Sequence, residues 1–193
     1  MANPADSYLP GFTPGPETAA DFRAALGRFA TGVTVVTAWG QDGRPVGMTA
    51  NSFASLSLDP PLVLWSPARA SMRFAAFSAA KGFSVHVLDD SQLDLARHFT
   101  KSGHFPEGSE PRRGADDLPI LSEALARFDC RTEARYDGGD HQILVGRVLH
   151  AHARDGAPLL FLRGKFGSFE PCPTAPAASP PPTDVAGGDD AKS

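Results

Sequence analysis

The sequence lacks the features by which several protein classes are most easily recognised. Its two cysteines, Cys130 and Cys172, stand far apart without a CxxC spacing, so neither a disulfide framework nor a zinc site is indicated. No apolar run approaches the roughly 20 residues that a membrane-spanning helix needs, and the first residues do not resemble a signal peptide. A net charge of −4, with both signs interspersed, disfavours nucleic acid as the main partner. We therefore expect a cytoplasmic protein that binds neither membranes nor nucleic acids.

The common nucleotide and catalytic motifs are also missing. There is no GxGxxG between a strand and a helix, no GxxxxGK[ST] and no GxSxG. His141, His150 and His152 have no cysteine or carboxylate cluster nearby, and we predict no metal site. The residue types of a catalytic triad occur at 91, 94 and 98, but on one helix they fall on different faces and lack a nucleophile turn.

The length and composition suit one domain with flanking arms. A chain of 193 residues, 41% of them hydrophobic, is long enough to bury a sizeable core. Residues 1–16 are rich in proline and have no apolar periodicity, which predicts a flexible arm. Residues 170–193 are rich in proline and alanine without an aromatic residue, so we predict a disordered tail. The domain itself is expected to span 17–169.

Apolar spacing predicts three helices in this domain. The first begins at Thr18, and its apolar residues recur at helical spacing, so we expect it to pack one stripe on the core and to end at Gly32. That stripe consists of Phe22, Ala25, Leu26 and Phe29. The second helix is predicted at 71–82, ending at Gly82, and the third runs from Ser91, as N-cap, to Phe99.

Alternating and β-branched segments predict strands. They lie at 32–39, 61–66, 83–88, 126–136, 142–153 and 159–166. The last three are joined by short turns and predict a meander, while 100–119 is a long loop of the kind that forms lids or binding segments. Together these segments predict a closed or nearly closed antiparallel barrel with helices around it.

Three short polar stretches are candidate binding segments. In "TANSF" (49–53), small hydroxyls and backbone N–H groups would suit the edge of a planar ligand with carbonyl oxygens, and an ordinary turn is the alternative. In "SPARASM" (66–72), Ser66, Arg69 and Ser71 would suit a phosphate, and a plain N-cap by Ser71 is the alternative. In "GGDH" (138–141), a tight turn would aim a histidine into a pocket, and a surface hairpin is the alternative.

Five blocks, in this order and spacing, resemble the flavin reductase-like proteins with the FMN-binding split-barrel fold. They are "RFATGVTVVTA" (28–38), "GMTANSFASLSLDPPLVLWS" (47–66), "FSVHVLDDSQLDLARHF" (83–99), "GGDHQILVGRV" (138–148) and "APLLFLRGKFG" (157–167). The resemblance covers nearly all of 20–167. It implies a mainly β, antiparallel, Greek-key-like split barrel with a few peripheral helices, and a homodimer with flavin sites near the subunit interface.

The resemblance also implies which residues form the site. Thr49, Ala50, Asn51 and Ser52 match the segment along the isoalloxazine ring, and Ser66, Arg69 and Ser71 match the ribityl and phosphate clamp. Phe99 matches a position near the flavin's tail, and His141 matches the histidine that places the nicotinamide, the one catalytic assignment. Arg163, Gly164 and Phe166 match the closing strand beside the same pocket. Family members usually carry asparagine where this chain has His86, so no flavin contact is assigned there.

The activity implied by the resemblance is that of an NAD(P)H:flavin oxidoreductase. It would transfer hydride from NADH or NADPH to FMN or FAD and supply reduced flavin to a partner monooxygenase. A split-barrel monooxygenase or oxidase that retains its flavin is one alternative, and a non-catalytic flavin-binding protein is another. The sequence does not indicate whether the enzyme prefers FMN or FAD, or NADH or NADPH.

Overall fold

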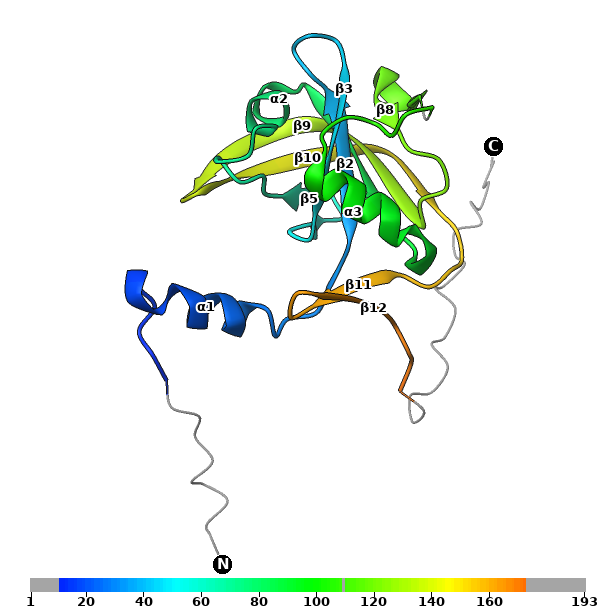
Figure 1. Cartoon of the computed structure of the whole chain (residues 1–193). Coiled ribbons are helices and arrows are strands. Elements are labelled where there is room, and N and C mark those ends of the chain that lie inside the picture. Colours follow the sequence, from blue (N-terminus) through cyan, green and yellow to red (C-terminus); the bar gives the residue numbers. More distant parts are fainter. Residues whose placement is uncertain (1–10, 109, 173–193) are drawn as a thin grey trace, which may run out of the picture.

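The computed structural model describes residues 11–108 and 110–172. The expectations for residues 1–10 of the arm and 173–193 of the tail lie outside the described residues. An antiparallel barrel forms the body of the molecule. Below it, in the view of Figure 1, lie α1 (Ala19–Leu26) and the hairpin of β11 (Leu159–Leu162) and β12 (Lys165–Ser168). No helix in the described ranges is long and apolar enough to cross a membrane.

Seven strands pair in one sheet, and every pairing in it is antiparallel. Their order is β3 (Pro45–Ala50), β2 (Thr34–Trp39), β6 (Gly82–Val87), β9 (Ala126–Gly138), β10 (His141–Ala153), β5 (Leu62–Trp65) and β4 (Ala54–Ser57). The two edge strands, β3 and β4, are neighbours in sequence and do not pair with each other in the described sheet. The barrel is therefore open along this seam, and residues 51–53 cross it.

Two hydrophobic clusters form because side chains along a strand alternate between faces. On β2, Val36 and Ala38 join a cluster in which the rings of Trp65 and Phe77 meet edge to face at 4.9 Å. Val35 joins a second cluster around Phe99, Leu88 and Leu159. Cys130 belongs to the first cluster, and burial raises the pKa of its thiol to about 12.

The long segment after α3 (Leu93–Lys101) is held on the sheet by buried polar contacts. It forms the short strands β7 (Arg112–Arg113) and β8 (Pro119–Ile120) with the turn η4 (Ala115–Asp117) between them. His86 fixes its end, because Nε2 of the buried ring accepts from Leu121 N at 3.0 Å while Nδ1 lies 3.0 Å from Val35 O. Position 86 therefore attaches this segment to the barrel.

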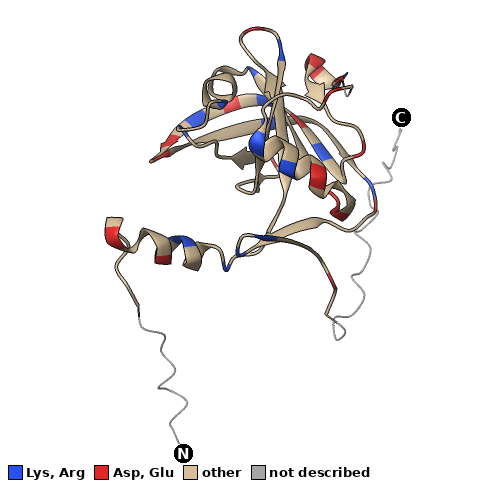
Figure 2. Ribbon diagram, in the orientation of Figure 1, with Lys and Arg blue, Asp and Glu red and all other residues tan. Residues whose placement is uncertain are grey.

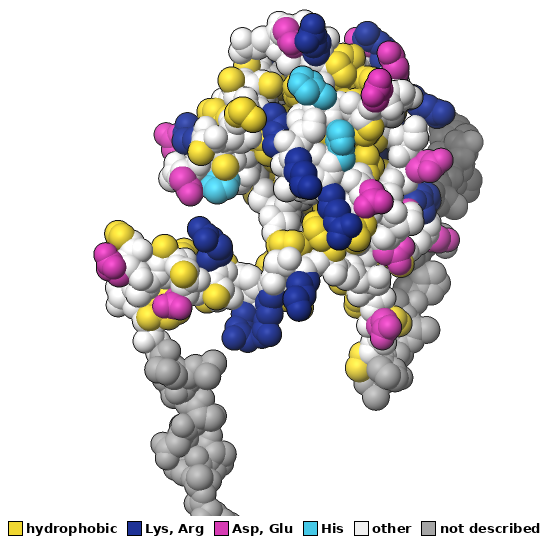
Figure 3. Space-filling model, viewed as in Figure 1, with side chains coloured by type: hydrophobic (Ala, Val, Ile, Leu, Met, Phe, Trp, Pro, Cys, Tyr) yellow, Lys and Arg dark blue, Asp and Glu magenta, His cyan; other side chains and the backbone are white. Residues whose placement is uncertain are grey.

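The first predicted helix is shorter than expected and lies apart from the barrel. α1 (Ala19–Leu26) follows a 3-10 turn, η2 (Pro16–Thr18), and its C-cap is Gly27 rather than Gly32. Phe22, Leu26 and Phe29 are 44%, 60% and 77% exposed, so the expectation that this stripe packs on the chain's own core is wrong. Figure 3 shows apolar side chains along this separate helix.

Two other boundaries differ because the caps were misidentified. α2 (Phe74–Ala79) is only six residues long, and Gly82 begins β6 instead of closing the helix. Before α3, Asp89 rather than Ser91 is the cap of the 3-10 turn η3 (Asp90–Gln92), and its Oδ1 accepts from Ser91 N at 3.0 Å.

The predicted strand 159–166 is a hairpin. β11 (Leu159–Leu162) turns at Arg163 and Gly164, both with positive φ, into β12 (Lys165–Ser168). β11 pairs with β12 and with β1 (Thr31–Gly32), and β10 pairs with β5 instead. The predicted meander therefore ends at β10.

Candidate functional site

A pocket of about 290 Å³ lies beside β3, the strand on one side of the open seam. It brings together Thr49, Ala50 and Asn51 with Val33, Phe161, Phe166, Arg97, Thr100 and Lys101. We call this cavity the seam pocket. Four of the predicted cofactor-binding residues thus line it, since Phe166 of the β11–β12 hairpin faces the same space as the three residues of β3 and its end.

The side-chain hydroxyls of this stretch are largely committed to the protein. Thr49 Oγ1 donates to Ala96 O at 2.7 Å, which joins β3 to α3, and Ala50 O accepts from Thr34 Oγ1 at 2.7 Å. Ser52 Oγ accepts from Ser66 N at 3.0 Å across the seam. A ligand in the seam pocket would therefore find few free hydroxyls there.

The backbone of β3 offers what the hydroxyls do not. Gly47 N points away from β2 and donates to Gly103 O at 2.8 Å. Because N–H directions alternate along an antiparallel strand, the N–H group of Thr49 points to that same edge, and Asn51 directly follows the end of the strand. A strand edge with free donors suits a planar ligand rimmed with carbonyl oxygens.

The cationic side of the seam pocket comes from α3 and was missed in the sequence. Ala96 and Phe99 face the core, and Arg97, Thr100 and Lys101 occupy the exposed face at i, i+3 and i+4 spacing. That spacing was visible in "LARHFTK" and would have found them. Figure 2 shows the basic segments on this helix.

The predicted phosphate clamp is attached to the turn between β9 and β10. Arg69 forms an ion pair with Asp137, and its Nε donates to Gly139 O at 3.3 Å, so its guanidinium is already partnered. Ser71 Oγ accepts from Arg73 N at 3.2 Å, just ahead of α2, so Ser71 itself is not the N-cap. Ser66 contributes its backbone to Ser52 across the seam.

His141 lies beside this clamp and begins β10. Its Nδ1 lies 2.8 Å from Asp140 Oδ1, and this hydrogen bond holds the pKa of Asp140 below its usual value. The imidazole is 43% exposed. Arg69 N donates to Asp140 O at 2.8 Å, so the "GGDH" turn is joined to the clamp and is more than a free surface hairpin.

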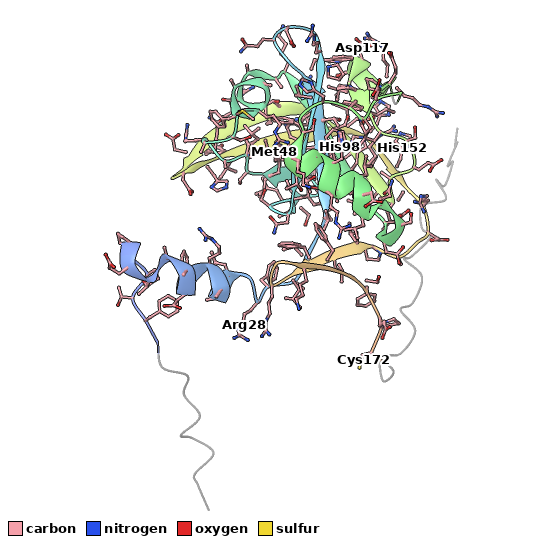
Figure 4. The ribbon with its side chains drawn as sticks, viewed as in Figure 1. Arg28, Met48, His98, Asp117, His152 and Cys172 are labelled. Atoms are coloured by element: carbon pink, nitrogen blue, oxygen red, sulfur yellow. The ribbon has the colours of Figure 1, made fainter. Side chains whose placement is uncertain are left out.

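Two further predicted residues lie at the turn of the β11–β12 hairpin. Arg163 and Gly164 line a second cavity of about 690 Å³ between this turn and α1, and this cavity shares Asn51 and Phe161 with the seam pocket. Arg28, which lines the same cavity, lies near the hairpin in Figure 4.

Phe99 is the exception among the predicted residues. Its ring is fully buried in the second cluster and offers no surface to a ligand. The residue supports α3 from behind, and the ligand-facing positions are its exposed neighbours.

The seam pocket suits a flat, anionic cofactor. Phe161 and Phe166 supply aromatic walls, the edge of β3 supplies neutral donors, and α3 supplies two cations for a phosphate. Fold and site together define an antiparallel split-barrel protein with a pocket of aromatic walls and cationic residues beside β3.

Comparison with known proteins identifies the family. The model of the "Flavin reductase like domain" matches residues 26–170, and the chain belongs to the flavin reductase-like family. An FMN reductase (NADH) of Agrobacterium fabrum is 52% identical over 158 residues, covering 82% of this chain and 90% of the relative. A flavin-dependent monooxygenase reductase subunit of Rhodococcus jostii is 42% identical over 158 residues, covering 81% and 80%.

A solved structure confirms the predicted fold. The NADH:FAD oxidoreductase of Streptomyces globisporus, in complex with NAD and FAD fragments, superposes with a TM-score of 0.73 at 35% identity. The superposition covers 88% of this chain and 100% of the Streptomyces chain. The predicted enzyme class is confirmed: the protein is an NAD(P)H-dependent flavin reductase.

Proposed function

We propose that this enzyme passes a hydride from NADH, in preference to NADPH, to FMN or FAD and releases the reduced flavin to a partner monooxygenase. The observation that carries the proposal is the seam pocket, where strand-edge N–H groups, aromatic walls and two cations surround one cavity. The relatives named as an NADH-dependent FMN reductase and as a monooxygenase reductase subunit support the choice of donor and partner.

In this proposal the chain holds and orients the flavin, and the flavin supplies the chemistry by accepting a hydride from reduced nicotinamide. The N–H groups of Thr49 and Asn51 donate to the rim of the ring, where negative charge grows on reduction. Ala50 and Ser52 are the other two residues of the segment 49–52, and we assign them to the same edge of the ring. Lys101 and Arg97 neutralise the phosphate. Arg97 makes one exposed ion pair, with Asp94 at 3.5 Å, whereas Arg69 is held by both Asp137 and Gly139 O.

We propose that His141 orients the nicotinamide. Asp140 holds Nδ1, and Nε2 has no protein partner in the described part of the chain. Ser66 and Ser71 are assigned to the ribityl and phosphate side of the flavin. Phe166 closes the seam pocket from the hairpin side, and Arg163 and Gly164 border the flavin from the neighbouring cavity beside α1.

We also propose that two copies associate through α1. Phe22, Leu26 and Phe29 form an exposed apolar stripe on and just after a helix that contacts little of its own chain. Exposed apolar surfaces of this kind mark interaction sites. A dimer would bury it beside the cavity that shares Asn51 with the seam pocket. Light scattering on the full chain tests this, and a monomer at micromolar concentration would contradict it.

The activity is tested by following NADH and NADPH oxidation with FMN, FAD or riboflavin added separately. Turnover that depends on added flavin supports the proposal. Flavin that stays bound through gel filtration would favour the retained-flavin alternative, and flavin binding without nicotinamide oxidation would favour the non-catalytic one.

A pair of histidine variants tests the assignment of His141. His141→Ala should raise the KM for NADH and leave the affinity for flavin unchanged. His152→Ala is the matched control, because His152 is an exposed histidine of the same strand that lies away from the clamp (Figure 4). Equal KM values in the two variants would refute the assignment.

A further inference from the structure

One arginine outside the seam pocket gathers four backbone carbonyls. The guanidinium of Arg73 donates from Nη1 to Phe99 O at 2.6 Å, Ser102 O at 3.1 Å and Gly47 O at 3.3 Å, and from Nη2 to Thr100 O at 3.1 Å. These carbonyls belong to the end of α3 and to β3, the two elements that supply the cations and the free strand edge. Arg73 itself stands between the clamp and α2.

The end of α3 needs this side chain because its C-cap residue, Ser102, leaves some of the last carbonyls unsatisfied. Helices often end on a glycine in the left-handed region that satisfies the last carbonyls, but Ser102 is extended, with φ −112° and ψ 142°. Ser102 N satisfies only His98 O, at 2.8 Å. The carbonyls of Phe99 and Thr100 are left to Arg73, whose charge is also favourable at a helix C-terminus.

Two glycines make room for this arrangement. A Cβ on Gly103 would lie 2.7 Å from Arg73 Cδ, and a Cβ on Gly47 would lie 2.3 Å from the Phe99 ring. Neither glycine has a positive φ, so close approach rather than backbone freedom explains them. Partial burial lowers the pKa of the Arg73 guanidinium from its ordinary value, as expected for a charge drawn out of water.

Besides the packing of Phe99 on Gly47, a side-chain hydrogen bond joins the middle of α3 to β3. Ala96 O accepts from Thr49 Oγ1 at 2.7 Å and from Thr100 Oγ1 at 2.9 Å, one full turn before the end. Beyond Ala96 the helix continues to Thr100 and Lys101, which line the seam pocket. Their position relative to the free edge of β3 therefore depends on what holds the last turn.

We propose that Arg73 is a positioning residue for flavin, which fixes the last turn of α3, and with it Thr100 and Lys101, against the free edge of β3. The role rests on the proposed function of the seam pocket. Loss of the guanidinium frays that turn and misplaces the phosphate-binding cation, while the residues assigned to the nicotinamide are untouched. The binding of flavin should therefore weaken, and the rate at saturating flavin should remain.

The test compares Arg73→Ala with Arg135→Ala. Arg135 is a matched control because it also caps carbonyls, donating to Ser78 O and Ala80 O, both at 2.7 Å, at the far end of α2. Flavin dissociation constants come from the quenching of flavin fluorescence, with steady-state kinetics in parallel. Arg73→Ala should weaken FMN binding by up to about fivefold, the value of the surface ion pair between Lys101 and the phosphate, with kcat unchanged. Arg135→Ala should lower the melting temperature without changing flavin binding.

Two further measurements separate positioning from a general loss of stability. Arg73→Lys keeps the charge but cannot span four carbonyls. Its affinity for FMN should therefore fall between that of the wild type and that of Arg73→Ala. Hydrogen exchange at 99–102 should accelerate in Arg73→Ala and not in Arg135→Ala. Unchanged FMN affinity in Arg73→Ala, beside normal binding by the wild type, would overturn the role of Arg73 alone. Wild-type protein that binds no flavin would overturn the proposed function and this role with it.

Discussion

Acid should destabilise this protein through His86 before most carboxylates titrate. The ring is fully buried, and this desolvation lowers its pKa from 6.5 to about 4, although the hydrogen bond to Val35 O acts in the opposite direction. Arg127 and Asp129 are the charged groups that face it. Protonation would also turn Nε2 from acceptor to donor and break the bond from Leu121 N.

The sign and size of the effect follow from these two pKa values. Between pH 6.5 and about 4 the unfolded chain binds a proton at His86 and the folded protein does not, so stability is full above this window and falls as the pH drops through it. The difference of roughly 2.5 pKa units corresponds to an upper bound of about 3 kcal/mol. The carboxylates with lowered pKa values, such as Asp89 and Glu133, lose their contributions at lower pH.

His86→Asn isolates this contribution, because asparagine does not titrate. Urea unfolding of both proteins at neutral pH and near pH 4.5 measures the free energy of unfolding. We expect the variant to be less stable at neutral pH by about 1–3 kcal/mol, since one of two buried polar contacts is lost. The gap between the proteins should narrow by about 2 kcal/mol in acid. A gap that stays constant with pH would refute the reasoning, because the other acid-sensitive groups are common to both proteins.

Three other substitutions test the site and its supports. Lys101→Gln should weaken FMN binding roughly fivefold, the value of a surface ion pair, without changing the affinity for riboflavin, which lacks the phosphate; equal weakening in fluorescence titrations would refute the phosphate role. Gly47→Ala should cost about 1–3 kcal/mol in urea unfolding through its clash with Phe99, and wild-type stability would contradict the close approach. Asp89→Asn should lower stability by about 1 kcal/mol at neutral pH, because it removes the carboxylate charge that pairs with Arg154 and accepts from Ser91 N. That deficit should vanish as acid protonates the wild-type carboxylate, whose pKa is lowered chiefly by Ser91.

Local patterns predicted the strands well because alternation is a property of the strand itself. The segments 83–88 and 126–136 fall within one or two residues of β6 and the first part of β9. The apolar stripe on α1 was also recognised correctly. Periodicity does not say which surface covers such a stripe, however, and here the core of the chain itself does not cover it. The hairpin at 159–166 was missed although Arg163-Gly164 carries a turn signal, because the apolar residues on either side continue the strand pattern.

The segments of the site were predictable, but the role of its hydroxyls was not. The stretch 49–52 was recognised by its small polar side chains, and its hydroxyls and backbone N–H groups were both predicted to meet the ligand. In the structure Thr49 Oγ1 donates to Ala96 O of α3, and Ser52 Oγ accepts from Ser66 N. These hydroxyls therefore make hydrogen bonds within the protein at the point where the hydrogen bonds of the sheet end. Their function is to keep β3 and α3 in place while the edge of β3 stays unpaired. In the proposed function, recognition of the flavin rim falls to backbone N–H groups, which any residue but proline supplies, so side-chain types alone do not identify the positions that donate.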